Sequence, residues 1–114
     1  MFHSTHVFTG ETICRRPAQN YTEFTDELNR LQTLQQTFAQ SSITERTALL
    51  QQFADSLTQN QERLAEMVCE EVGRCLHECR AEINKSIELI RYYVRLAPEL
   101  LAHKTIATQA SLSQ

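Results

Sequence analysis

The chain has 114 residues, a formal net charge of −3 and a hydrophobic fraction of 41%. This length suits one small domain. Acidic and basic residues alternate along it, so it lacks the clustered Lys and Arg that nucleic-acid backbones require. No apolar run reaches the ~20 residues needed to span a bilayer. We therefore expect no nucleic-acid partner and no membrane partner.

Glycine and proline number two each, too few for a sheet-rich fold with several tight turns. The start, MFHSTHVF, lacks the basic and then apolar stretches of a secretory signal. This predicts a cytoplasmic chain with four reduced cysteines. The predicted fold class is mostly α, with a short N-terminal β-hairpin followed by about four amphipathic helices.

Residues 1–20 form the predicted hairpin region. Val7–Ile13 has the pattern of strand, turn and strand, in which Gly10 supplies the positive φ of a tight turn. Pro17 is expected to end the second strand. Because two strands alone are marginal in water, the hairpin needs a surface to lie against.

Residues 21–101 form the predicted helical region. The first helix is expected from Tyr21 to Ala39, with apolar residues at helical spacing. The second begins after Ser42, which forms a capping box with Glu45. The expected apolar faces are Phe24, Leu28, Leu31, Leu34 and Phe38 in the first helix, and Leu49, Leu50, Phe53, Ala54 and Leu57 in the second.

A third helix is expected to begin at Asn60 as N-cap and to end at Gly73 in a left-handed C-cap. Its inward residues are predicted to be Leu64, Ala65, Met67, Val68 and Val72.

The fourth helix has the clearest pattern, because apolar residues recur from Leu76 to Leu101 at about the 3.6-residue α-helical period. Pro98 is expected to kink or end it. Residues 102–114 are predicted to be a tail or the start of a strand near Lys104–Thr108. The chain shows no internal repeat and no linker, so 1–114 is expected to be a single partial domain.

The segment EEVGRCLHEC at 70–79 raises the question of a metal or thiol site. Cys75 and Cys79 are four residues apart on a helix and share a face. Zinc requires four tetrahedral ligands, normally from two such pairs, and this chain has no second pair. His77 points away from both thiols. Cys79 belongs to the apolar stripe, where a free cysteine behaves as a small hydrophobe.

A cysteine nucleophile would need a neighbouring base and an oxyanion cradle. The four histidines, His3, His6, His77 and His103, are scattered and follow no recognisable signature. A Gly-rich phosphate cradle needs several glycines within a few residues. Gly10 and Gly73 stand far apart, so neither a dinucleotide-binding turn nor a P-loop can be formed.

Six short segments occur in order along the chain: VFTGETI at 7–13, SITER at 42–46 before Leu49–Leu50, EVGR at 71–74, ECRAEI at 78–83, RYY at 91–93, and LLA through IAT at 100–108. Their order and spacing resemble the N-terminal segment of the NAD(P)-dependent aldehyde dehydrogenases, closest to the succinate-semialdehyde dehydrogenase branch. Arg74 replaces the Lys of the family pattern, and His6-Val7 replaces its Asn-Pro.

The resemblance implies the N-terminal part of the aldehyde dehydrogenase fold without the cofactor-binding sheet. The family's nucleotide-binding sheet, general-base Glu and nucleophilic Cys lie downstream of the matched region. It therefore assigns no catalytic, cofactor-binding or metal residue here, and NAD or NADP is expected only for the full-length family. It also implies that Ala81 and Lys85 lie near the substrate tunnel, and that EEVGRCLHEC is a helix–glycine–helix joint.

Three functions follow, in order of weight. The first is a truncated aldehyde dehydrogenase-like protein, inactive alone, whose parent oxidises an aldehyde or semialdehyde to the acid with NAD(P). Such a chain is expected to self-associate or to bind the missing C-terminal remainder through exposed apolar helix faces. The second is a small helical protein-interaction module. The third is a thiol-based metal or redox sensor built on Cys69, Cys75 and Cys79.

Overall fold

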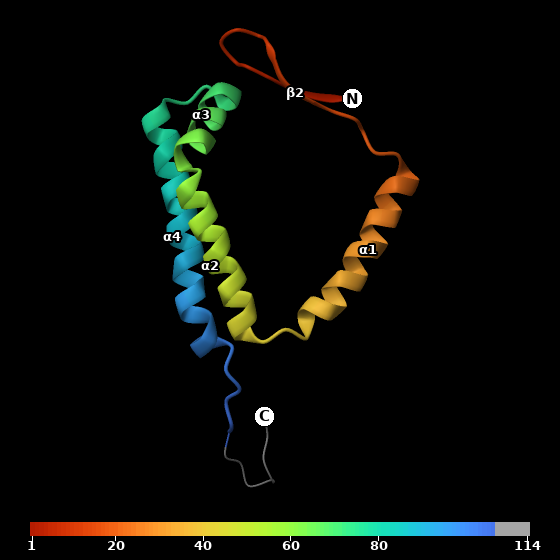
Figure 1. The fold of residues 1–114 in the computed structure, drawn as a ribbon, viewed down its shortest axis with the longest axis vertical. Helices are drawn as coiled ribbons and strands as arrows, with labels where there is room; N and C mark the ends of the chain where they lie inside the picture. Colours follow the sequence, from red (N-terminus) through yellow and green to blue (C-terminus); the bar gives the residue numbers. More distant parts are fainter. Residues whose placement is uncertain (107–114) are drawn as a thin grey trace.

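A two-stranded hairpin precedes four helices in the computed structural model, which describes residues 1–106 (Figure 1). The elements are β1 (Phe2–Thr5), β2 (Thr12–Arg16), α1 (Tyr21–Ala39), α2 (Ile43–Gln59), α3 (Gln61–Val72) and α4 (Leu76–Leu100). The predicted fold class is confirmed. Of the strand start predicted near Lys104–Thr108, residues 104–106 are described and show no strand beyond an isolated bridge at Ile106, and 107–108 lie outside the described residues. Among those described, no helix is both long and apolar enough to cross a bilayer.

The hairpin lies further toward the N-terminus than the sequence predicted. β1 and β2 pair antiparallel, with Phe2 opposite Arg16. Val7 and Phe8 were predicted to be in a strand, but they lie in the loop that connects β1 and β2. The physical reason is that the Val7 amide donates to the carbonyl of Glu70 at 3.0 Å, and so leaves the strand ladder for α3. Gly10 has a φ of 75°, as predicted, and β2 ends directly before Pro17.

α1 has the predicted bounds, and its N-terminus is closed by a capping box between Asn20 and Glu23. None of its residues is buried. Figure 1 shows α1 standing apart from α2, α3 and α4, to which it is joined through the short turn before α2. The helix therefore forms from local signals, without a packed face in the described chain.

The turn between α1 and α2 is held by polar contacts. Ser42 and Glu45 form the predicted capping box, and the hydrogen bonds from Ser42 lower the pKa of the Glu45 carboxyl. Arg46 donates to the carbonyls of Ala39 and Ser41 at 2.7 and 3.1 Å. These bonds satisfy carbonyl groups that the end of a helix leaves unpaired.

The junction between α2 and α3 differs from the prediction at Asn60. Its side chain does not cap α3; the amide nitrogen donates to the Ser56 carbonyl at 2.8 Å. The backbone of Asn60 has φ −103° and ψ 10°, whereas an N-cap side chain reaches back from an extended backbone. Because α2 runs almost directly into α3, Asn60 is the C-cap of α2 and its side chain donates to a carbonyl of that helix.

α2 and α3 both pack against α4, and Figure 1 shows α4 alongside α2 over most of its length. The fully buried residues are small, Ala54 of α2, Ala65 of α3 and Cys79 of α4, and the larger Ile87 of α4 is buried beside them. Small residues let helix backbones approach closely. The helix ends at Leu100, two residues after Pro98.

Several residues predicted to point inward are exposed. Met67 and Val72 of α3 are 41% and 61% exposed, and Leu101, after α4, is 66% exposed. The α2 residues Leu49, Leu50 and Phe53 are likewise exposed. Their apolar periodicity is real, but the described chain supplies no element to cover them.

The part of the chain that the structure describes is extended, measuring 70 × 40 × 22 Å with a radius of gyration of 20.7 Å. A compact domain of this length has a radius of gyration of about 13 Å. Its accessible surface is 9514 Å², against about 6,400 Å² for a compact monomer of this mass. Much more surface is therefore open than a self-contained domain leaves exposed.

We predict that Ser42→Ala lowers the free energy of unfolding by about 1 kcal/mol, because α2 loses its N-terminal cap. The matched variant Asn20→Ala removes the same kind of cap from α1. It should leave the main transition unchanged, because α1 packs extensively on no other element. Urea unfolding followed by circular dichroism measures both variants. Equal destabilisation would show that α1 folds together with α2–α4.

We also predict that Gly73→Ala is destabilising by about 1–2 kcal/mol, because its φ of 80° is in the left-handed region. An added Cβ would also lie 3.0 Å from Val7 Cγ2. Gly10→Ala shares the positive φ but meets nothing within 4 Å. It should leave the helical transition in place, whereas Gly73→Ala should lower its midpoint. A Gly73→Ala protein with an unchanged midpoint would contradict this reading of the joint.

Candidate functional site

The joint between α3 and α4 brings the hairpin and the predicted thiol segment together. Gly73 ends α3 in the left-handed conformation, and its amide donates to the Cys69 carbonyl at 2.9 Å. The hydroxyl of Ser4 donates to Glu71 Oε1 at 2.7 Å, which ties β1 to the end of α3. The segment EEVGRCLHEC is thus a helix–glycine–helix joint that also anchors the hairpin.

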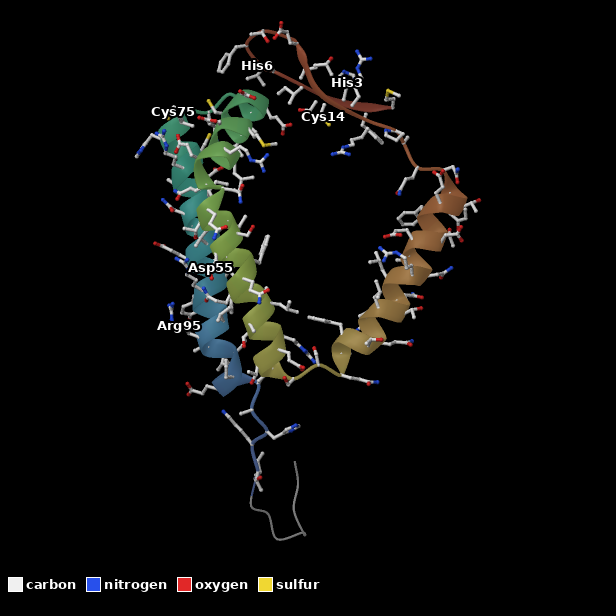
Figure 2. The ribbon with its side chains drawn as sticks, viewed as in Figure 1. His3, His6, Cys14, Asp55, Cys75 and Arg95 are labelled. Carbon is white, nitrogen blue, oxygen red and sulfur yellow. The ribbon has the colours of Figure 1, made fainter. Side chains whose placement is uncertain are left out.

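An open hollow of about 320 Å³ lies along the hairpin and reaches Glu71 of α3. Its lining residues are Phe2, His3, Ser4, Cys14, Arg16 and Glu71. Arg16 and Glu71 supply opposite charges, and Ser4 is already bound to Glu71. Figure 2 shows Cys14 on the hairpin and Cys75 at the joint, so these two thiols come from separate elements.

The three cysteines of the joint differ in exposure: Cys75 is exposed, Cys69 is half-buried and Cys79 is fully buried. Burial raises the pKa of the Cys79 thiol, and the neighbouring Cys69 and Cys75 raise it further. A raised pKa leaves less thiolate, which is the reactive and metal-binding form. Cys79 is therefore a core residue and not a nucleophile.

The histidines do not complete a catalytic pair with these thiols. His6 accepts a hydrogen bond on Nδ1 from the Phe8 amide at 3.2 Å. His77 is exposed near the start of α4, and His103 follows α4. Within residues 1–106, no thiol is hydrogen-bonded to an imidazole, and no three His, Cys, Asp or Glu side chains gather closely enough to hold a metal ion. The described residues therefore hold no ligand set for the metal form of the sensor hypothesis.

A second hollow, open and about 550 Å³ in volume, lies along the outer face of α4. Its lining residues are Lys85, Glu88, Leu89, Arg91, Tyr92 and Arg95. Lys85, which the resemblance placed near a substrate tunnel, is in this set. Ala81 is exposed one turn earlier and does not line the hollow. Whether either residue approaches a substrate stays a prediction.

The charges of this hollow are largely free to meet another molecule. Arg91 donates to Asp55 Oδ1 of α2 at 3.2 Å, which holds α4 against α2. Figure 2 shows Asp55 on α2 and Arg95 further along α4. Lys85 and Arg95 flank Leu89 and Tyr92, an arrangement that can pack against an apolar group beside an acidic one. Such an arrangement offers positioning of a bound group by charge and by apolar contact.

The residues present do not fit a nicotinamide nucleotide. A pyrophosphate cradle requires closely spaced glycines in a strand-to-helix turn. The sequence has only two glycines, and neither lies in a strand-to-helix turn. Gly10 lies in the loop between two strands, and Gly73 joins two helices. No step of dinucleotide chemistry can be assigned to these residues.

Comparison with known proteins decides what kind of chain this is. A model of the aldehyde dehydrogenase family matches residues 1–114. The chain belongs to the aldehyde dehydrogenase family. The family predicted from the sequence is therefore confirmed.

Two curated relatives carry the same name. The chain is 27% identical over 105 residues to a succinate-semialdehyde dehydrogenase [NADP(+)] of Deinococcus radiodurans. This alignment covers 92% of this chain and 22% of that protein. It is 30% identical over 105 residues to a probable succinate-semialdehyde dehydrogenase [NADP(+)] of Synechocystis sp., covering 92% of this chain and 23% of that protein. The chain thus spans less than a quarter of the length of these relatives.

The fold is also shared with solved aldehyde dehydrogenases. Succinic semialdehyde dehydrogenase from Streptococcus pyogenes, solved in complex with NADP+, superposes with a TM-score of 0.86 at 21% identity. The superposition covers 98% of this chain and 25% of that chain. The open placement of α1 is therefore part of the aldehyde dehydrogenase fold.

Sequence reasoning missed the residues that join elements. Arg80 binds Glu62 and Arg91 binds Asp55, which ties α4 to α3 and α2. Opposite charges at these positions were visible, but the helix pairing that brings them together was not. Ser4 and Glu71 were missed for the same reason. Leu89 and Tyr92, which line the outer hollow, were missed too, although they follow Lys85 at helical spacing.

We predict that alkylation with iodoacetamide modifies Cys75 first and Cys79 last. Cys79 is buried and its raised pKa keeps it protonated, so its modification should be slow at neutral pH and should need a more alkaline solution. Peptide mass mapping over time measures each site, and unfolding in urea, which should equalise the rates, is the control. Equal rates in the folded protein would show that Cys79 is open to solvent.

Because the Cys79 pKa is raised in the folded chain, the folded chain holds this proton more tightly than the unfolded chain does. The free energy of unfolding should therefore fall as the pH rises through the raised Cys79 pKa.

Proposed function

We propose that residues 1–114 form the N-terminal helical part of an NADP+-dependent semialdehyde dehydrogenase, which oxidises the aldehyde group to a carboxylic acid. The observation that carries the proposal is the match of 92% of the chain to two succinate-semialdehyde dehydrogenases. The family match over residues 1–114 supports the reaction class.

Within such an enzyme, this segment acts as scaffolding. Its buried thiol is a core residue, its glycines form a hairpin loop and a helix joint, and its helices carry apolar faces. Catalytic and cofactor-binding groups come from other parts of the enzyme. Residues 1–114 alone are thus expected to be inactive. The four unpaired cysteines support a reducing compartment such as the cytoplasm.

We predict that the purified chain, given succinate semialdehyde and NADP+, forms no NADPH. A chimera that replaces the matched N-terminal segment of the Synechocystis relative with residues 1–114 should form NADPH, because the scaffold is then joined to the missing groups. Absorbance of NADPH measures both, and the unaltered Synechocystis enzyme is the control.

Two results would contradict the proposal. One is turnover by the purified chain that survives replacement of all four cysteines by serine. The other is a soluble, folded chimera that oxidises no aldehyde with either NADP+ or NAD+.

A protein-interaction module is the second candidate, favoured by the apolar side chains that α1 and α2 leave exposed. Such a module would bind one partner unrelated to dehydrogenases in a fixed ratio. A pull-down that recovers a stoichiometric partner of this kind distinguishes it from an enzyme segment.

A further inference from the structure

The outer hollow of α4 combines positive charge with an apolar floor. Its lining residues are Lys85, Glu88, Leu89, Arg91, Tyr92 and Arg95. Leu89 and Tyr92 lie between Lys85 and Arg95 along the helix, and they are 54% and 49% exposed. At 100° per residue, Lys85, Tyr92 and Arg95 lie within about 80° of the helix circumference. The hollow therefore has a cation near each end and apolar side chains in the middle.

The cations at the two ends are open to another molecule. Within residues 1–106, no ion pair engages Lys85, Glu88 or Arg95. Arg91 differs, because it donates to Asp55 Oδ1 at 3.2 Å and so has its counter-charge on α2. Lys85 and Arg95 thus exceed Glu88 by one positive charge, which favours an anionic ligand in this hollow.

The separation of the two cations indicates a ligand with more than one negative group. Arg95 follows Lys85 by ten residues, which is about 15 Å along a helix that rises about 1.5 Å per residue. Both side chains have long stems that can lie along apolar surface while their charged heads stay in water. A single carboxylate would satisfy one end only. Two carboxylates on a short alkyl chain would satisfy both ends and place the chain on the floor.

We propose that the outer hollow of α4 binds a short aliphatic dicarboxylate. One carboxylate lies at Lys85 and the other at Arg95, and the alkyl chain lies against Leu89 and Tyr92. The identity of the ligand rests on the proposed function, because oxidation of the aldehyde group of a semialdehyde yields a dicarboxylate. The floor is supported from one side, since the Tyr93 ring meets the Tyr92 ring edge-on with 5.4 Å between their centroids.

The test is a titration of the 1–114 chain with sodium succinate, a four-carbon dicarboxylate, followed through the amide chemical shifts of α4. We expect saturable shifts confined to the residues of the hollow. Butanoate has the same number of carbons but one carboxylate, and sulfate is a compact dianion. Both should bind several-fold more weakly than succinate, because butanoate engages one cation and sulfate cannot reach both.

Lys85→Met and Arg95→Met each remove one cation and keep an unbranched side chain of high helix propensity. Each should weaken succinate binding by about threefold, as expected for the loss of one exposed ion pair. Lys104→Met, at an exposed position after α4, and Arg63→Met, at an exposed position on α3, remove the same charges elsewhere. These two controls should leave the succinate affinity unchanged, and circular dichroism should show the same helix content in all four variants.

Glu88→Gln tests the sign of the charge effect. The Glu88 carboxylate lines the hollow and repels an anion there. Its neutral replacement should therefore tighten succinate binding by about twofold, the opposite of the effect of losing either cation.

Three results would overturn the dicarboxylate site. The first is a succinate affinity no higher than that for butanoate or sulfate. The second is equal succinate binding by Lys85→Met and Lys104→Met. The third is weaker binding by Glu88→Gln. All three are measured without turnover, so an active chimera alongside any of them would remove the site and leave the proposed function standing. An inactive chimera alongside selective succinate binding would contradict the proposed function and leave the site.

Discussion

The packing of α4 against α2 and α3 is the interaction on which the rest of this chain depends. Its buried centre is made of small residues, Ala54, Ala65 and Cys79, with Ile87 as the one large aliphatic residue. Close helix approach, more than bulky side chains, therefore holds the three helices together. Ion pairs of Arg80 and Arg91 lie at its margin and are solvent-exposed, so they contribute orientation more than stability.

The joint at Gly73 makes that packing possible, because it reverses the chain between α3 and α4. A left-handed residue at this point lets Cys79 turn back beneath α3. The same reversal presents the Glu70 carbonyl and the Glu71 carboxylate to the hairpin. The acids and thiols there are neighbours in the sequence, but a metal site needs ligands that converge on one point, and the described residues hold no such cluster.

Local signals in the sequence were enough to predict most of the elements. The bounds of α1, the capping box at Ser42 and the left-handed Gly73 each depend on residues within one or two turns. The failures involve groups that reach further. Asn60 was misassigned because α2 continues almost into α3, and the Val7 strand was misplaced because its amide binds α3, which is distant in sequence. Two separated glycines and scattered histidines are the local features from which no catalytic residue is predicted.

Apolar periodicity predicts that a face will be covered, but it does not say by which chain. α1 and α4 show the same helical repeat, yet Ile87 of α4 is buried and Leu31 of α1 is about half exposed. The difference lies in what the sequence alone cannot show, the presence of an opposing surface. In a self-contained domain the two stripes would be buried together. Here, the apolar face of α4 is covered within the chain, whereas that of α1 is not. The chain as a whole aligns with only 25% of the Streptococcus pyogenes enzyme. The exposed faces of α1 and α2 therefore lack an opposing surface within the described residues.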